Sequence, residues 1–338
     1  MKKYDIAIVG ASGLVGETIL KILEERKFPI NNLYLLASER SLGRSFSFRD
    51  SQLSVELLDK FDFSKVQIAF FSAGASVSKE YAPKATEAGA VVIDNTSYFR
   101  YQDDVPLIVP ECNIERLDDY SAKGIIANPN CSTIQMVVAL YPIYKSVGIE
   151  RINVATYQAV SGAGRSAMDR LSAETSFYLE NKKKDNASLI PFAFNVIPQI
   201  DIFLDNGFTK EEMKMVWETK KILGDNSISV NPTCVRVPVY YGHSEAIHIE
   251  TKTKISVEEV TKLLERAPGV TVVDDRSSSL FPTPRINAAY KDDVFVGRIR
   301  EDTTHPRGIN LWVVSDNVRK GAALNSIQIA ESLIEEVM

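Results

Sequence analysis

The chain of 338 residues has only three cysteines, three histidines and two tryptophans. Three widely spaced cysteines, Cys112, Cys131 and Cys234, do not make a disulfide framework, which favours a reducing, cytoplasmic setting. The histidines do not cluster with cysteines at zinc spacing, so no metal is expected. Apolar runs of about 18 residues are absent, and the short N-terminal run does not resemble a signal peptide, so no membrane span is expected.

The sequence also lacks a strong excess of either charge. Its formal net charge is −5, and charged residues make up 25% of it. Nothing therefore suggests a nucleic acid or an anionic membrane as a partner. A negatively charged small-molecule substrate would have to be bound by a few specific arginines or lysines.

The first 130 residues alternate between short apolar runs and helical patterns. The runs are continuously apolar, which is typical of parallel strands covered on both faces. A helix with a broad apolar face is expected over 13–27. The expected strands are 4–9, 33–37, 66–71, 91–93, 107–109 and 124–127.

After residue 131 the strands are longer, with one apolar and one mixed face. Ile247 and Ile249 alternate with Ala246, His248 and Glu250, as expected for a sheet with only one face buried in its own core. The sequence therefore predicts an α/β protein with two domains. The first is expected at 1–130, completed by the C-terminal helix 318–338, and the second at 131–317.

The segment GASGLVG, residues 10–16, lies between the first expected strand and the first expected helix. Glycines there let the backbone approach a dinucleotide pyrophosphate, which the free N–H groups of the helix start can bind. The spacing is GxxGxxG rather than GxGxxG, so the prediction of dinucleotide binding rests mainly on the position of the loop between a strand and a helix. The alternative is that the glycines serve only the tight packing of the helix on the strand. After the second strand, Glu39 could bind the ribose diol of NAD. Ser38, Arg40 and Ser41 could instead hold the 2′-phosphate of NADP, and residue types leave that choice open.

The segment NPNCST predicts a helix start, with Asn130 as N-cap and Cys131 in the first turn. The helix dipole and the unpaired N–H groups there lower the thiol pKa and favour the nucleophilic thiolate. A small buried hydrophobic side chain is the alternative, and it is the expected state of Cys112 and Cys234. Beside a nicotinamide, a thiolate would add to an aldehyde, which would then lose hydride and leave a thioester. That step needs a base and oxyanion donors, and His243 is the candidate base.

Four segments agree in order and spacing with bacterial aspartate-semialdehyde dehydrogenases: GASGLVG, NPNCST, YQAVSGAG at 157–164 and CVRVPVYYGHSEA at 234–246. The chain resembles this family over essentially its whole length. The resemblance implies a Rossmann-like doubly wound parallel sheet, followed by an α+β catalytic and dimerisation domain of GAPDH-like type. It implies that aspartate 4-semialdehyde, phosphate and NADP⁺ react reversibly to 4-aspartyl phosphate and NADPH through a cysteine thioester. The reverse direction is biosynthetic and leads toward lysine, diaminopimelate, threonine and methionine.

The resemblance also assigns roles to single residues. Cys131 would be the nucleophile, His243 the acid/base group, and Gln158 would orient the substrate or the thioester. The substrate-binding residues would be Gln158, Arg236 and Glu211, and the phosphate-binding residues Arg100 and Lys214. The cofactor-binding residues would be Gly10, Ser12, Gly13, Leu14, Val15, Gly16, Ser38, Arg40, Ser41, Leu42, Ser161, Gly162 and Asn317.

Some features leave alternatives open. Without the resemblance, Glu211 and Lys214 would be a surface ion pair behind a capping box of Thr209 and Glu212. The second loop of the family commonly reads like SARSAG, whereas this chain has SERSLG, so NADP is favoured but Glu39 leaves room for NAD. A homodimer or a dimer of dimers is expected by resemblance alone.

Two other functions compete with this one. N-acetyl-γ-glutamyl-phosphate reductase uses the same thioester chemistry on a longer, N-acylated substrate. A non-catalytic nucleotide-binding relative would be expected to lack the cysteine or the histidine, and both are present here.

Overall fold

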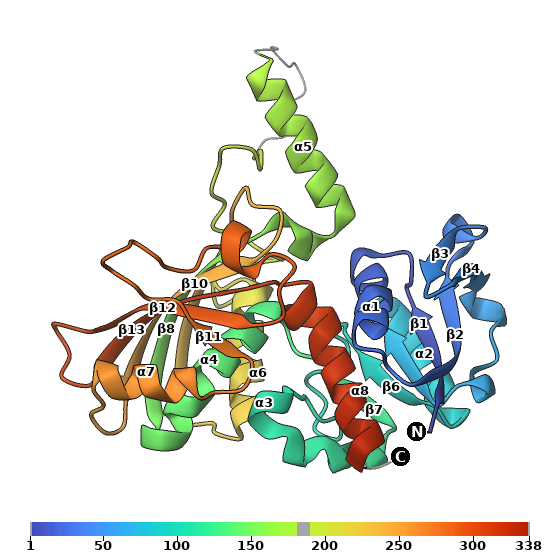
Figure 1. The fold of residues 1–338 in the computed structure, drawn as a ribbon, viewed down its shortest axis with the longest axis horizontal. Helices are drawn as coiled ribbons and strands as arrows, with labels where there is room; N and C mark the ends of the chain where they lie inside the picture. The colour runs from blue at the N-terminus through green and yellow to red at the C-terminus, as the bar shows by residue number, and fades with distance from the viewer. Residues whose placement is uncertain (1, 181–189, 337–338) are drawn as a thin grey trace. The chain divides into compact units, whose positions relative to one another are not determined.

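The computed structural model describes residues 2–180 and 190–336. The chain divides into two compact units, drawn in Figure 1. Unit 1 comprises Met1–Asn130 and Ala322–Met338, and unit 2 comprises Cys131–Gly321. Within the described ranges, no helix is long and apolar enough to cross a membrane.

Unit 1 is built on a seven-stranded sheet of order β3-β4-β2-β1-β5-β6-β7. All neighbouring strands are parallel except β3 and β4, which form an antiparallel pair at the edge. The strands are β1 (Tyr4–Val9), β2 (Ile30–Ala37), β3 (Ser45–Phe48), β4 (Ser51–Leu57), β5 (Ile68–Phe71), β6 (Val91–Asp94) and β7 (Ile125–Ala127). The helices are α1 (Leu14–Glu25), α2 (Ala75–Glu87), α3 (Pro110–Asn113) and α8 (Leu324–Glu336). The predicted parallel sheet is confirmed, and all four residues of β5 are buried as a continuous apolar strand should be.

One expected strand of unit 1 is wrong. Residues 107–109 do not form a strand, and Leu107 makes only an isolated bridge with Ala127. Pro106 precedes this run and Pro110 begins α3. Proline has no N–H to give to a ladder, so the run is too short for a strand although all three of its residues are buried.

The C-terminal helix α8 returns to unit 1 and contacts α1, α3 and β6. Ile327 and Leu333 lie in the same hydrophobic core as Ile19 of α1. An ion pair between Arg26 and Glu331, with Nε and Oε1 2.7 Å apart, joins the two helices at the surface. The last turn of the helix expected up to 338 includes residues 337–338, which lie outside the described residues.

Unit 2 contains a six-stranded mixed sheet of order β11-β12-β13-β10-β8-β9. The pairs β8–β9 and β11–β12 are parallel, and the other pairs are antiparallel. The strands are β8 (Ile149–Gln158), β9 (Ser229–Arg236), β10 (His243–Thr251), β11 (Val270–Val272), β12 (Val294–Glu301) and β13 (Gly308–Ser315). The helices are α4 (Cys131–Val147), α5 (Arg165–Leu179), α6 (Lys210–Leu223) and α7 (Val257–Glu265).

The sheet of unit 2 is covered by its own helices on one face. Helices α4, α6 and α7 contact its strands, whereas α5 stands away from the sheet (Figure 1). Along β10, Ile247 and Ile249 are buried, while Ala246, His248 and Glu250 are partly exposed. The predicted one-sided sheet is therefore confirmed, and its second face, the open face, carries Tyr157 of β8 and Trp312 of β13 with ring centroids 5.6 Å apart.

Candidate active site

Cys131 is the first residue of α4, as the Asn-Pro-Asn segment predicts. Its side chain is partly exposed, whereas Cys112 and Cys234 are buried. Burial raises the pKa of the Cys234 thiol far above its ordinary value. Of the three cysteines, only Cys131 therefore combines a helix start with access to small molecules.

Gln158, the last residue of β8, connects that strand to the start of α4. Its side-chain Nε2 donates to the Ser132 hydroxyl over 2.7 Å and to Oε1 of Glu211 over 3.3 Å. Ser132 follows Cys131 directly, so the Gln158 amide is held one residue from the sulfur. Glu211 comes from the first turn of α6, which brings three elements of unit 2 together at this point.

Glu211 and Lys214 do form an ion pair, with Oε2 and Nζ 2.9 Å apart, but the expectation of a surface pair is wrong. Both side chains are largely buried, and Lys214 also bonds to Asp201 over 2.9 Å. Burial alone would lower the pKa of Lys214, but the two carboxylates outweigh that effect and raise it. The capping box of Thr209 and Glu212 is confirmed and fixes this end of α6.

Arg236 and His243 are bound to the same residue, Ala159, which follows β8. The Ala159 N–H donates to Nδ1 of His243 over 3.0 Å, and the Ala159 carbonyl accepts from Nη1 of Arg236 over 2.6 Å. Burial, and then the Arg236 charge, hold the pKa of His243 well below its ordinary value. Burial lowers the pKa of Arg236, and the negative charges of Glu211 and Cys131 act in the opposite direction. A histidine, an arginine and a thiol thus interact in one buried part of unit 2.

Ser161 and Asn317 are also brought together in unit 2. The Asn317 Nδ2 donates to the Ser161 hydroxyl over 2.9 Å, and its Oδ1 accepts from the Gly242 N–H over 3.0 Å. Gly162 lies beside the histidine and the arginine. A Cβ at Gly162 would be 3.3 Å from Nε2 of His243 and 3.3 Å from Nη1 of Arg236, so only a glycine lets the backbone lie against these two groups without crowding them.

The glycine loop of unit 1 has the geometry that a pyrophosphate needs. Gly10 has φ +89°, and a Cβ on Gly16 would overlap the Gly10 carbonyl oxygen, so the loop can close only around glycine. Gly13 precedes α1 without any side-chain cap, which leaves the first N–H groups of a twelve-residue helix available. Leu14 and Val15 form its first turn. These residues fit a dinucleotide.

The second loop of unit 1 lies next to the glycine loop. The hydroxyls of Ser12 and Ser41 are 2.8 Å apart. Ser38, Arg40 and the exposed Leu42 follow β2, and Arg40 makes no ion pair with any residue that the structure describes. An exposed guanidinium beside the loop is therefore available for an anion.

Arg100 belongs to unit 1 and follows β6. Its side chain is buried, and Nη2 donates to the Asn95 carbonyl over 3.0 Å. Asp94 lies nearby, and although burial raises the pKa of that carboxyl, the Arg100 charge acts in the opposite direction.

Four residues of this region were not expected from the sequence. Ser132, Ala159 and Asp201 act through the hydrogen bonds described above, and none of them carries a local signal. The fourth is Gly321, where a Cβ would be 2.7 Å from the Cβ of Cys131. A glycine inside the expected C-terminal helix is the one hint that the sequence offered.

A buried carboxyl, Glu245, was also not expected. It lies on β10 two residues after His243 and is fully buried, where a negative charge would be poorly solvated. Its oxygens make no hydrogen bond of good geometry with a described residue. Burial raises the pKa of Glu245 well above its ordinary value, and the nearby Gln135 amide of α4 opposes this only in part.

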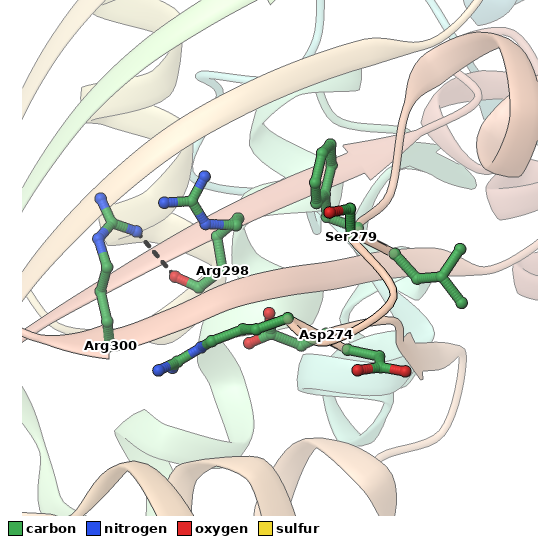
Figure 2. Close-up of a pocket in the computed structure, with 8 residues that line it drawn as sticks. Asp274, Ser279, Arg298 and Arg300 are labelled. Atoms are coloured by element: carbon green, nitrogen blue, oxygen red, sulfur yellow. Dashed lines mark hydrogen bonds between the residues drawn. The ribbon is translucent and has the colours of Figure 1, made fainter.

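A separate cavity of about 310 Å³ lies beside β12. Figure 2 shows Arg298 and Arg300 on this strand together with Asp274 and Ser279 of the segment after β11. Nη1 of Arg300 donates to the Arg298 carbonyl over 2.7 Å. This cavity shares no residue with the cluster around Cys131.

Family models match both units of the chain. The model described as semialdehyde dehydrogenase, NAD binding domain, matches residues 5–120, and the model described as semialdehyde dehydrogenase, dimerisation domain, matches residues 140–320. An aspartate-semialdehyde dehydrogenase from Legionella pneumophila is 60% identical over 100% of this chain and 97% of its own length.

Solved structures of aspartate-semialdehyde dehydrogenases also match this chain over nearly its full length. Aspartate semialdehyde dehydrogenase II from Vibrio cholerae, complexed with ASA, is 55% identical, with a TM-score of 0.97 over 100% of both chains. The aspartate semialdehyde dehydrogenase with NADP from Candida albicans is 27% identical, with a TM-score of 0.76 over 98% of this chain and 99% of its own.

Proposed function

The chain belongs to the aspartate-semialdehyde dehydrogenase family, and we propose that the cluster around Cys131 carries out that family's reaction. Aspartate 4-semialdehyde, phosphate and the oxidised nicotinamide cofactor react reversibly to 4-aspartyl phosphate and the reduced cofactor. The biosynthetic direction is the reductive dephosphorylation of 4-aspartyl phosphate, toward lysine, diaminopimelate, threonine and methionine. The observation that supports this most directly is a partly exposed cysteine at a helix start, in the same unit as a buried arginine and histidine.

Each side chain has a role that its contacts support. Cys131 is the nucleophile that carries the acyl group as a thioester. The guanidinium of Arg236 gives one donor to Ala159, and its other donors make no hydrogen bond with a described residue, so they are available as a fork for the substrate carboxylate. Gln158 orients the substrate beside Cys131, and His243 acts at the reacting oxygen. Glu211 completes the substrate-binding group through its contact with Gln158.

Phosphate binding is proposed for Lys214 and Arg100. The Lys214 ammonium is held by Glu211 and Asp201 on one side, which orients it without removing its charge. A site that accepts phosphate must exclude water, because water would otherwise hydrolyse the thioester.

The cofactor is proposed to be NADP, bound by the glycine loop and the second loop of unit 1. When bound, the nicotinamide takes up or returns the hydride of the reacting carbon. Ser161, Gly162 and Asn317 are proposed to bind the nicotinamide half, since Gly162 lies against His243 and Arg236, and Asn317 bonds to Ser161. Arg40 is the proposed partner of the 2′-phosphate.

We further propose that the open face of the unit 2 sheet forms a homodimer, and a dimer of dimers is the larger alternative. Tyr157 and Trp312 stand on this face, and unit 2 matches a family model described as a dimerisation domain. A cytoplasmic location stays a prediction, which rests on the small number and wide spacing of the three cysteines in the sequence.

The substrate is tested by following NADPH absorbance with aspartate semialdehyde or N-acetyl-glutamate semialdehyde, each with and without phosphate. We expect steady turnover only with aspartate semialdehyde and phosphate. Without an acceptor, the reaction should stop after about one NADPH per active site, because the thioester on Cys131 persists. Full turnover without phosphate would indicate a hydrolytic aldehyde dehydrogenase, and a preference for the N-acetylated substrate would indicate the reductase.

Two variants separate the anion contacts in the same assay. Arg100→Leu should raise the KM for phosphate more than that for the aldehyde. Arg236→Leu should do the reverse, because a buried carboxylate without a partner is costly. Equal effects of each variant on both KM values would contradict the assignment.

A further inference from the structure

The buried face of the unit 2 sheet carries polar side chains in two adjacent rows. The first row comprises Arg236 of β9, Gln158 of β8 and His243 of β10, which are the strand residues of the proposed active site. Gln158 pairs with Arg236 in the sheet, and Ala159, the next residue, bonds to the His243 ring. The register of three strands therefore brings this first row together.

The second row lies two residues farther from the active site along each strand. Thr156 of β8 pairs with Cys234 of β9 on one side and with Glu245 of β10 on the other. Residues two apart on a strand point to the same face, and all three side chains are fully buried. The third row is apolar and consists of Pro232, Val154 and Ile247. Core formation alone therefore does not account for a carboxyl in the second row.

Helix α4 crosses both rows with a matching step. Cys131 and Gln135 are one turn apart on the same side of this helix, about 6 Å along its axis. Two residues of a strand cover a similar distance, about 6.6 Å. Cys131 interacts with Arg236 in the first row. Gln135 interacts with Glu245 in the second row, so this pair lies one step behind the sulfur along both elements.

Glu245 and Gln135 have complementary hydrogen-bonding groups when the carboxyl keeps its proton. A neutral carboxyl offers a donor and an acceptor, and so does an amide. Both side chains are buried, and neither makes a hydrogen bond of good geometry with another residue in the described ranges. Burial raises the pKa of Glu245 well above its ordinary value. The titratable neighbours are Cys234 in the same row and His243 on the same strand, and burial favours the neutral form of both.

We propose that Glu245 is a positioning residue, which binds the Gln135 amide directly or through one water molecule and thereby holds the first turns of α4, with Cys131, in place beside Arg236. This inference rests on the proposed function of the site. Glu245 touches neither the substrate nor the cofactor and acts only through the helix. Such an effect is measurable, because a displacement of about 1 Å at a reacting group can cost roughly 100-fold in rate.

Leucine variants separate positioning from stability. Glu245→Leu leaves the buried Gln135 amide without its partner and should lower both stability and activity. Glu245→Leu/Gln135→Leu replaces both polar groups by apolar ones of similar size and should regain most of the stability. Its NADPH burst should nevertheless be roughly 10- to 100-fold slower than that of the unchanged protein, because no directional contact holds the helix. The KM for the aldehyde should change much less, since Arg236 is kept.

An exchanged variant, Glu245→Gln/Gln135→Glu, restores an acid–amide pair with the two partners swapped. Its burst rate should return to within about threefold of that of the unchanged protein, as for two residues that act together. Glu250→Gln is the matched control, because Glu250 lies on the same strand but is partly exposed on the open face. It should leave the burst rate unchanged.

Alkylation of Cys131 by iodoacetamide gives a second readout, which needs no substrate. In the double leucine variant, the midpoint of its pH dependence should move upward by roughly 0.5–1 pH unit, because the thiolate loses part of its interaction with Arg236. The exchanged variant should keep the original midpoint. If the protein did not turn over aspartate semialdehyde, the proposed function would fail, whereas the alkylation comparison would still test the position of Cys131.

Two results would overturn the positioning role. A double leucine variant with the burst rate and alkylation midpoint of the unchanged protein would show that the pair supports only the fold. A folded exchanged variant as slow as the leucine variants would show that Glu245 does not act through Gln135. Thermal unfolding establishes which variants are folded, and if the exchanged variant is not, the double leucine variant alone decides between the two roles.

Discussion

Cys131 and Cys234 are placed in opposite environments within the same unit. Cys234 is fully buried against Met215, with the two sulfurs 3.8 Å apart, whereas Cys131 begins α4 and is partly exposed. Iodoacetamide should therefore alkylate Cys131 much faster than Cys234 or Cys112. Cys131→Ala should fold and bind the cofactor but lose turnover by several orders of magnitude. Mass spectrometry of the labelled peptides and a turnover assay check both points, and a variant with a tenth of the original activity would rule out the covalent route.

Glu245 predicts a pH dependence of stability. Its folded-state pKa is raised above the ordinary value of 4.5, so the folded protein keeps a proton that the unfolded chain loses. As pH rises above that value, this group lowers the free energy of unfolding by about 1.4 kcal/mol per pH unit until the folded-state pKa is reached. Glu245→Gln cannot ionise, so its stability relative to the unchanged protein should increase as the pH rises above the ordinary pKa of about 4.5.

Urea unfolding at several pH values measures this difference. Glu250→Gln is the matched control, because Glu250 lies on the same strand but is partly exposed on the open face. Its substitution removes the same charge without touching a buried carboxyl, so it should change the free energy of unfolding much less than Glu245→Gln does. A constant difference for Glu245→Gln would mean that the carboxyl is not held protonated.

Arg40 is proposed to read the 2′-phosphate of NADP. Arg40→Ala should raise the KM for NADP by roughly 10- to 100-fold, since a charged contact is worth about 1.5–3 kcal/mol, and should affect NAD much less. Arg44→Ala is the control, because Arg44 is a neighbouring arginine already paired with Glu17 at 3.5 Å. Equal effects of Arg40→Ala on both cofactors would point to Glu39 and NAD.

The sequence predicted those single residues that have a local signal. The helix start at Cys131 and the capping box at Thr209 are set by side chains within a few positions, so they can be recognised without a fold. The bond between Ala159 and His243 joins residues 84 positions apart and depends on the register of β8 with β10. No local pattern contains that information, and the same holds for the pairing of Lys214 with Asp201.

Helix α6 positions Glu211 and Lys214 through its N-terminal cap. The Thr209 hydroxyl accepts from the Glu212 N–H, and Glu212 also accepts from the backbone of Cys234 in β9. Thr209→Val removes the hydroxyl and should cost about 1 kcal/mol of stability. It should also raise the KM for the aldehyde, because the first turn would move.

Thr209→Ser keeps the hydroxyl and serves as the control for this helix. It should behave like the unchanged protein in both thermal unfolding and KM. A Val variant with normal KM and lower stability would show that the cap supports only the fold and not the position of Glu211.

At the level of elements, the sequence predicted the parallel sheet better than its edges. The strands at the centre of the unit 1 sheet are continuously apolar, and that pattern is specific enough to recognise. The run 107–109 is equally apolar, but flanking prolines stop it from joining the ladder as a strand. The edge strands β3 and β4 were not predicted, because most of their residues are exposed and few apolar positions distinguish them from a loop.

The whole molecule is expected to be a dimer through the open face of unit 2. Tyr157→Asp places a charge on that face, and burying an unpaired carboxylate costs several kcal/mol. Sedimentation at micromolar concentration should then find monomers where the unchanged protein is dimeric. Lys262→Glu, on the exposed side of α7, should remain dimeric. A dimeric Tyr157→Asp variant would place the interface elsewhere.

The chain crosses between its two units only twice, after Asn130 and after Gly321. The last residue of unit 2 before the second crossing lies against its first residue, because a Cβ on Gly321 would be 2.7 Å from the Cβ of Cys131. Any larger residue at position 321 would therefore press on the nucleophile itself.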